Sequence, residues 1–226
     1  MLVKILLRAG LSDVLNVAQQ MGITSEIPEV PSISLGTPDI SLFEMVNAYT
    51  CFPNNGKRVH TKYINSIQLP TGKEIYKDKS QKIKEVFAKN VAAIMTNMME
   101  SVVNWGTARP LRTTFNLTTP IAGKIGTTQN QADGWFVGFT PQITAGAWVG
   151  ADNPGIHFQS IKQGSGAKTA LPIWGLFVQH LQQDATYAPL LEGEFKSPAQ
   201  RDLNCLNLPL YRESPQKVEV INSPDL

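Results

Sequence analysis

The chain has 226 residues, of which 42% are hydrophobic and 17% are charged, and its formal net charge at neutral pH is +2. This is the composition of an ordinary globular domain that is long enough to bury a core. The small net charge gives no support to binding of nucleic acid or of an anionic membrane surface, so we expect no nucleic-acid partner.

The N-terminal segment is predicted to be one amphipathic helix. Apolar residues recur at helical spacing from Leu2 to Gln20, and Gly22 ends the helix. Lys4 and Arg8 interrupt the apolar run, no small-residue cleavage site follows, and nothing approaches the roughly 20 apolar residues of a membrane span. We expect no export signal or membrane segment in this chain, which would stay in the cytoplasm if made alone.

The next predicted elements are a helix and a hairpin. After a proline-rich loop, Asp39 or Ser41 can cap a helix over residues 42–52. Residues 59–69 and 73–76 have the pattern of two strands joined by a glycine-containing turn.

A long helix and three strands are predicted to follow. Residues 83–104 show a helical period, and their apolar stripe is expected to face the core: Val91, Ile94, Met95, Met98 and Val102. Strands are predicted over 121–128, 134–140 and 144–150, and the last two should pair antiparallel around Pro141.

The C-terminal part is predicted to be a helix and then a tail. The helix covers residues 167–182; beyond Asp184 the chain is polar and interrupted by prolines, and its last stretch is expected to be poorly ordered. We therefore assign residues 1–184 to a folded unit and residues 185–226 to a tail. Hairpin-connected strands with segregated helices indicate the α+β class, with an antiparallel sheet flanked by helices.

The cysteines and histidines show no metal-binding pattern. Cys51 and Cys205 are the only two cysteines, and two isolated thiols fit better than one disulfide. His60, His157 and His180 lack the spacing of metal ligands, and no His-Glu-x-x-His motif occurs. We expect neither a metal nor a cofactor.

The strongest chemical signal is Ala-Gly-Lys-Ile-Gly-Thr-Thr over residues 122–128. A phosphate-binding P-loop requires glycine and Ser/Thr at the places of Thr118 and Ile125, so that interpretation fails. In a strand, Lys124, Gly126 and Thr128 would share one face. On such a strand, the lysine and a hydroxyl would hold a peptide carboxylate, and the glycine would allow another backbone to approach closely. A backbone N–H of the strand could serve an oxyanion hole. A polar strand end without function would have the same pattern.

Several segments resemble landmarks of class A penicillin-binding proteins. The family's Lys-Thr-Gly-Thr-Thr region resembles Gly123–Thr128, followed by Asp133–Pro141 and Ala147–Gly150. Other landmarks of the transpeptidase domain follow in the family's order: Met21-Gly22-Ile23, Ser34-Leu35-Gly36, Glu44-Met45, Ala48-Tyr49, Phe52–Gly56, Gly106-Thr107-Ala108 and Ala170–Trp174. The resemblance covers residues 2–181, and its ordered agreement is more specific than any single motif.

The resemblance implies the C-terminal part of a transpeptidase domain, with a partial β-lactamase-like fold. The family is membrane-anchored, works outside the cytoplasmic membrane and cross-links peptidoglycan stem peptides through a serine that β-lactams also acylate. By position, Lys124 supports proton transfer and binds carboxylate, and Gly126 permits close approach of the substrate. Thr127 binds carboxylate and offers its N–H to the oxyanion, while Ile125 and Thr128 complete the substrate-binding strand.

The sequence departs from the family pattern at the nucleophile. No Ser-x-x-Lys or Ser-x-Asn motif precedes Lys124, and the chain is expected to begin just past them. Literal Ser-x-x-Lys matches at 165–168 and 214–217 lie after the lysine strand, opposite to the family order. We therefore expect a chain that is inactive alone, exposes apolar surface and needs the N-terminal half of the domain as its partner.

Ile125 is a further departure, because the family has threonine or serine there. Loss of a hydrogen bond to a charged group costs about 1.5–3 kcal/mol, so Ile125 predicts weaker recognition of substrate and β-lactam. Asp133 is expected to form a turn rather than act as an acid, and Trp135 and Trp148 to pack together. Glu44 has no evident carboxylate partner for acid–base catalysis. The alternative function is a non-catalytic protein that binds a peptide or a partner chain.

Overall fold

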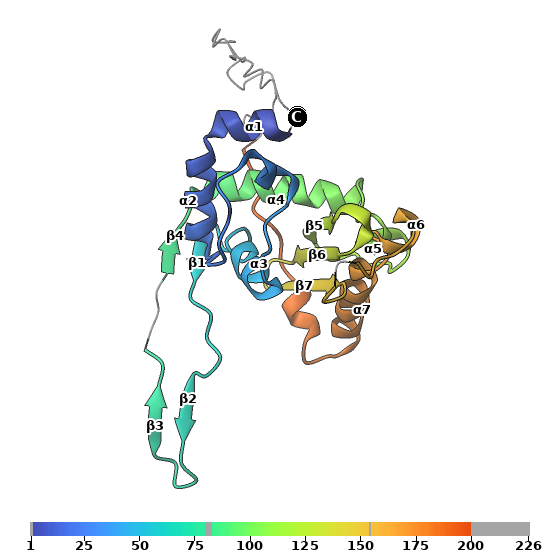
Figure 1. The fold of residues 1–226 in the computed structure, drawn as a ribbon. Helices are drawn as coiled ribbons and strands as arrows, with labels where there is room; N and C mark the ends of the chain where they lie inside the picture. Colours follow the sequence, from blue (N-terminus) through green and yellow to red (C-terminus); the bar gives the residue numbers. More distant parts are fainter. Residues whose placement is uncertain (1, 80–82, 154, 200–226) are drawn as a thin grey trace, which may run out of the picture.

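The computed structural model describes residues 2–79, 83–153 and 155–199. Its centre is an antiparallel sheet of β5 (Ala122–Thr127), β6 (Gly134–Phe139) and β7 (Thr144–Val149), in that order. Figure 1 shows helices around this sheet and a thin hairpin that extends far from the body. The α+β class and the antiparallel pairing are thereby confirmed, and the three strands lie within one or two residues of their predicted bounds.

One face of the sheet is buried under helices. Phe136 of β6 has no exposed surface, and its ring meets Trp174 edge-on with 5.2 Å between the ring centroids. The covering helices are α4 (Lys89–Asn104), α5 (Pro110–Thr113) and α7 (Ala170–Gln183). The main core also contains Val103, Ala108, Leu111, Leu117, Ile121, Ala147, Leu171 and Val178. Each large side chain buried here contributes roughly 1.5–3 kcal/mol.

The long helix predicted over 83–104 begins later and faces another way. Its first residues form β4 (Ile83–Glu85), and α4 starts at Lys89. The predicted stripe is out of phase, because Val91, Met95 and Met98 are exposed. The buried side chains are Ala92, Thr96, Met99 and Val103. Two of these four, Ala92 and Thr96, are small or polar, so hydrophobicity alone does not indicate that they are buried.

The single N-terminal helix is also corrected. The structure has α1 (Leu2–Ala9) and α2 (Leu11–Met21), separated at Gly10, whose φ of 90° lies outside the helical region. Gly22 ends α2 in the left-handed conformation, as predicted. A 3₁₀ helix η1 (Pro31–Leu35) lies within the proline-rich loop.

The second helix is shorter than predicted. It forms α3 (Leu42–Tyr49), and turns occupy the residues up to Gly56. Of the two candidate caps, Ser41 is the one used: its hydroxyl accepts from the Glu44 N–H, and the Glu44 carboxylate accepts from Ser41 in return. Cys51 behind this helix is fully buried, and burial raises its pKa to about 11. Its possible partner Cys205 lies outside the described residues.

The predicted hairpin is part of a longer two-stranded structure. Strand β2 (Ser66–Gln68) pairs with β3 (Glu74–Lys77), and β1 (Lys57–Val59) pairs with β4, both antiparallel. We call residues 57–85 the arm; the structure describes it except for residues 80–82. Both pairs belong to one extended projection in Figure 1.

Part of the predicted tail packs onto the body. After α6 (Ile161–Gly164) and α7, a 3₁₀ helix η3 (Ala188–Leu191) buries Leu191, and Phe195 lies edge-on against Phe139. Leu191 and Phe195 of the predicted tail therefore pack against the folded unit, and the division at residue 184 stays a prediction. The tail's apolar residues are few, but Leu191 joins the main core and Phe195 packs on Phe139 of β6. The remainder of the tail lies outside the described residues.

Candidate active site

The outer strand β5 carries four of the five residues predicted for the substrate-binding strand, and Thr128 follows directly after its last residue. Lys124 and Gly126 lie opposite Val137 and Trp135 of β6, so these four positions share one face of the sheet. Ile125 lies on the other face, where it packs against the main core. The predicted alternation is confirmed.

The backbone of β5 has a free edge at the predicted oxyanion residue. The Thr128 N–H donates to the Asp133 carbonyl oxygen over 3.1 Å, on the β6 side. Backbone groups alternate along a strand, so the N–H and C=O of Thr127 and Ile125 point to the outer edge. Lys124 uses this edge, since its Nζ donates to the Ile125 carbonyl oxygen over 2.7 Å. An exposed ammonium and an outward N–H thus lie on one strand edge.

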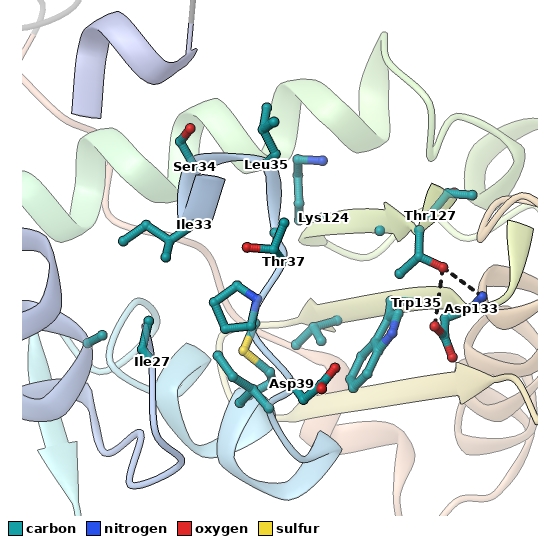
Figure 2. A pocket seen from close by; sticks show the side chains of 18 of the residues that line it. Ile27, Ile33, Ser34, Leu35, Thr37, Asp39, Lys124, Thr127, Asp133 and Trp135 are labelled. Atoms are coloured by element: carbon teal, nitrogen blue, oxygen red, sulfur yellow. Dashed lines mark hydrogen bonds between the residues drawn. The ribbon is translucent and has the colours of Figure 1, made fainter. Parts of the chain in front are cut away.

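This strand borders a cavity of about 980 Å³. All of residues 124–128 line it, and the opposite wall comes from the loop at 33–41 and from α1 and α2. Figure 2 shows residues of this loop around the same cavity as Lys124 and Trp135. No sequence pattern predicts that this loop borders β5, because its proline-rich character indicates an irregular backbone but not its location.

Apolar side chains of the N-terminal helices line this cavity, and those of α2 are only partly buried. Helix α2 buries none of its residues, and its Val14, Leu15 and Ala18 line the cavity. The stripe that predicted the helix is therefore covered only in part by the described residues. This supports the expectation of exposed apolar surface.

The two tryptophans and Asp133 form the floor of the cavity. Trp135 and Trp148 face each other across β6 and β7 with ring centroids 6.4 Å apart, as predicted. Gly126 makes room for them, because a Cβ there would lie 3.0 Å from the Trp135 Cβ. The Asp133 carboxylate accepts from the Trp148 indole N–H over 2.9 Å and from the Thr128 hydroxyl over 3.2 Å. Asp133 therefore ties the β5–β6 turn together, as expected of a turn residue.

The end of β5 is held by the turn before α7. The Thr127 hydroxyl accepts a hydrogen bond from the Gly166 N–H over 3.0 Å. Ser165, the serine of the first literal Ser-x-x-Lys match, lies beside this contact with its carbonyl oxygen accepting from the Lys168 N–H over 2.7 Å. Ser165 is not among the residues that line the cavity. The second match, at 214–217, lies outside the described residues.

Glu44 fixes the loops behind the cavity wall. One carboxylate oxygen accepts from the Thr24 N–H and hydroxyl at 2.7 and 2.6 Å and from the Ser25 N–H at 2.8 Å. The other accepts from the Ser25 hydroxyl at 2.5 Å and the Ser41 hydroxyl at 2.9 Å. Hydrogen bonds from Ser25 and then Thr24 hold the Glu44 pKa well below its usual range. Glu44 is a structural anion and has no partner for acid–base catalysis.

The described residues contain neither a metal-binding group nor a membrane-spanning helix. Within them, His, Cys, Asp and Glu form no group of three able to hold a metal ion. No helix in the same ranges is both long and apolar enough to cross a membrane.

An antiparallel sheet whose outer strand presents lysine, glycine and threonine to a cavity is the arrangement of part of a β-lactamase-like fold. The family model named Penicillin binding protein transpeptidase domain matches residues 28–169. The chain belongs to this family, and its relatives are of the class A type.

Relatives of known identity match most of this chain. Penicillin-binding protein 2D of Bacillus subtilis is 35% identical over 181 residues, which are 78% of this chain and 25% of that protein. Penicillin-binding protein 1A of Aquifex aeolicus is 34% identical over 172 residues, which are 76% of this chain and 23% of the relative. The chain thus spans about a quarter of the length of the curated relatives it matches.

Solved structures confirm the fold. Penicillin-binding protein 1A of Haemophilus influenzae superimposes with a TM-score of 0.75 at 20% identity, covering 87% of this chain and 34% of that one. The penicillin-binding protein PonA1 of Mycobacterium tuberculosis gives 0.72 at 21% identity, covering 88% and 55%. PonA1 has also been solved in complex with penicillin V. These likenesses place the chain on part of a transpeptidase domain.

Proposed function

We propose that this chain supplies the substrate-binding half of a peptidoglycan D,D-transpeptidase site. The carrying observation is the β5 edge, where the Lys124 ammonium and the outward N–H of Thr127 border the cavity. An ammonium and a hydroxyl bind the terminal carboxylate of a stem peptide, and the N–H faces the oxyanion.

The proposed reaction is an acyl transfer through a serine ester. The serine oxygen attacks the carbonyl carbon of the penultimate D-alanine, the C–N bond breaks, and the terminal D-alanine leaves with a proton. An amine of a neighbouring strand then attacks the ester and regenerates the serine. A β-lactam acylates the same serine, and Lys124 supports proton transfer in both reactions.

In this proposal, the nucleophilic serine comes from outside this chain. The sequence has no Ser-x-x-Lys motif before Lys124, and the matches after it stand off the cavity or outside the described residues. The N-terminal half of the domain is the proposed partner. The unburied apolar stripe of α2 and the cavity between it and β5 provide the space for that partner.

A chimera tests this proposal. The matching quarter of Bacillus subtilis penicillin-binding protein 2D is replaced by this chain, and covalent labelling by a fluorescent penicillin is read on a denaturing gel. We expect labelling of the chimera and none of the isolated chain. Lys124→Ala should abolish labelling, and Lys162→Ala, which changes an exposed lysine of α6, should not.

Two results would overturn the proposal. A chimera that melts cooperatively but takes no label shows that β5 does not complete a site. Penicillin-competable labelling of the isolated chain shows that a serine within it attacks, and Ser165 is then the first to replace.

The alternative function is non-catalytic binding of a peptide or a partner chain by the same edge. Ile125 favours it, because a family hydroxyl is replaced by a side chain that packs into the core. Titration of the chimera with a D-alanyl-D-alanine peptide separates the two: binding without acylation by penicillin supports the alternative.

A further inference from the structure

The arm differs from the rest of the chain in charge. Residues 57–85 contain eight Lys or Arg and three Asp or Glu, a net charge of +5, whereas the remainder of the chain carries −3. The whole-chain charge of +2 therefore hides a strong segregation. The exclusion of anionic surfaces from the overall charge does not hold for this segment.

Ion pairing within the arm leaves this excess in place. Asp78 lies 3.1 Å from the Lys62 ammonium, and Glu74 lies 3.7 Å from that of Lys77. At the root, Glu85 stands opposite Lys57 in the strand register, but Arg58 stands opposite Lys84. Like charges at directly opposed positions destabilise a strand pair. An anion beside the arm would relieve that repulsion.

The root of the arm gathers further cations from other elements. Lys57 of β1 and Lys89 at the start of α4 lie near Lys196 of the C-terminal segment, and the pKa of Lys196 is lowered, first by its contact with the Lys89 side chain and then by the nearby positive charges. Such mutual repulsion marks a region of positive potential. It extends the arm's basic character onto the body.

Apolar side chains are exposed along the same arm. Ile67 and Tyr76 form a cross-strand pair, 44% and 47% exposed, and Val59 and Ile83 form another. Further exposed apolar side chains are Tyr63, Ile64, Leu69 and Ile75. A two-stranded ribbon has no second layer to bury them.

Different kinds of partner use different parts of this surface. Lysine on an edge strand guards against strand pairing, which accounts for the charges but not for the apolar side chains. A nucleic acid or another soluble polyanion likewise uses only the charges. A protein partner uses the apolar residues, but the centres of protein interfaces are depleted in lysine. A lipid surface uses both, because the apolar side chains enter the headgroup layer and the lysines reach its phosphates.

We propose that the arm docks on an anionic lipid surface, with its apolar cross-strand pairs in the headgroup layer and its lysines on the lipid phosphates. The negative remainder of the chain is repelled from such a surface, so the charge segregation also orients the molecule with the arm foremost. Figure 1 shows that the arm projects away from the body, which leaves its far end sterically free.

Vesicle co-sedimentation of the full chain tests this proposal. Vesicles contain either phosphatidylglycerol mixed with phosphatidylcholine or phosphatidylcholine alone. We expect binding to the anionic vesicles only, and weakening by salt. Lys73→Gln with Lys79→Gln should lower the partition constant by roughly 30-fold, from the contribution of each lysine at such a surface. The matched control, Lys4→Gln with Lys162→Gln, removes two exposed lysines of the body and should change it little.

A second pair of variants tests the apolar part. Ile67→Ser with Tyr76→Ser should reduce vesicle binding at least as strongly as the charge variant. Ile173→Ser with Phe177→Ser is its control, because these α7 side chains are 51% and 44% exposed. A thermal melt of each variant checks that the body remains folded.

Three outcomes would overturn the proposal. The first is no binding of the parent chain to anionic vesicles. The second is loss of binding in the body controls equal to that in the arm variants. The third is binding that survives the apolar arm variant and is competed by soluble polyphosphate or DNA, which identifies a soluble polyanion as the partner. None of these results depends on acyl transfer.

Discussion

The sheet of β5–β7 and the arm are both antiparallel, yet they are stabilised in opposite ways. Phe136 and Ala147 of the sheet are buried, whereas every strand residue of β2 and β3 is exposed. The sheet has a core on one face and a cavity on the other. The arm has solvent on both faces.

Because of this difference, substitutions in the sheet and in the arm should have different effects. Packing fixes the sheet backbone, so the positions of Lys124 and the Thr127 N–H depend on side chains that never touch a ligand. The arm relies on backbone pairing and on exposed ion pairs, each of which contributes little. Changes under the sheet should therefore act on folding, and changes on the arm should act on what it binds.

The largest expected effect is that of Phe136→Ala. It removes a fully buried ring and its edge contact with Trp174. The free energy of unfolding should fall by about 3–5 kcal/mol. Urea denaturation measures it, with Tyr76→Ala on the arm as the comparison, expected to stay within about 0.5 kcal/mol. Equal losses for both would show that the arm has a core of its own.

The next effect is a gain of recognition at Ile125. In the chimera, Ile125→Thr restores the family's hydroxyl, which is worth about 1.5–3 kcal/mol in binding of a carboxylate. Penicillin labelling should become faster, while the melting temperature falls slightly because Ile125 packs against the core. Ile125→Val is the control, since it keeps the branched shape without the hydroxyl. Unchanged labelling by the threonine variant would mean that the hydroxyl does not reach the ligand.

A smaller effect should follow acidification through Glu44. Its folded pKa lies below the ordinary value of 4.5, so its contribution is present above that pH and is lost as pH falls below it. Glu44→Gln should therefore destabilise the chain at pH 7 and flatten the loss of stability below pH 4.5. Solvent screening keeps this effect modest. Thermal melts of both proteins across this range measure it, and parallel curves would contradict it.

The smallest effect is expected for an ion pair of the arm. Glu74 and Lys77 are 3.7 Å apart and largely exposed. Glu74→Gln should change the free energy of unfolding by less than about 0.5 kcal/mol, while vesicle binding improves because one negative charge is removed. A loss of stability above 1 kcal/mol would show that the arm folds cooperatively with the body.

The sequence predicted the features that local chemistry controls. The three central strands follow from alternation and turn residues, and their pairing follows from short connections. Gly22 ends α2 because it adopts the left-handed conformation, and Ser41 begins α3 because its hydroxyl caps it. Four of the five candidate site residues share β5 and Thr128 follows it, and the order of the motifs along the chain indicated the family.

Other features were decided only by tertiary structure, because they depend on which neighbour a side chain meets. The period of α4 indicates a helix but not its phase, since the buried face contains Ala92 and Thr96 and not the predicted apolar stripe. The stripe of α2 indicates an apolar face but not that the face borders a cavity. The sequence itself places the positive excess in residues 57–85, but only the fold shows that this segment projects from the body as a two-stranded ribbon. Sequence alone determines local conformation, whereas packing determines which faces are buried and which remain free to bind.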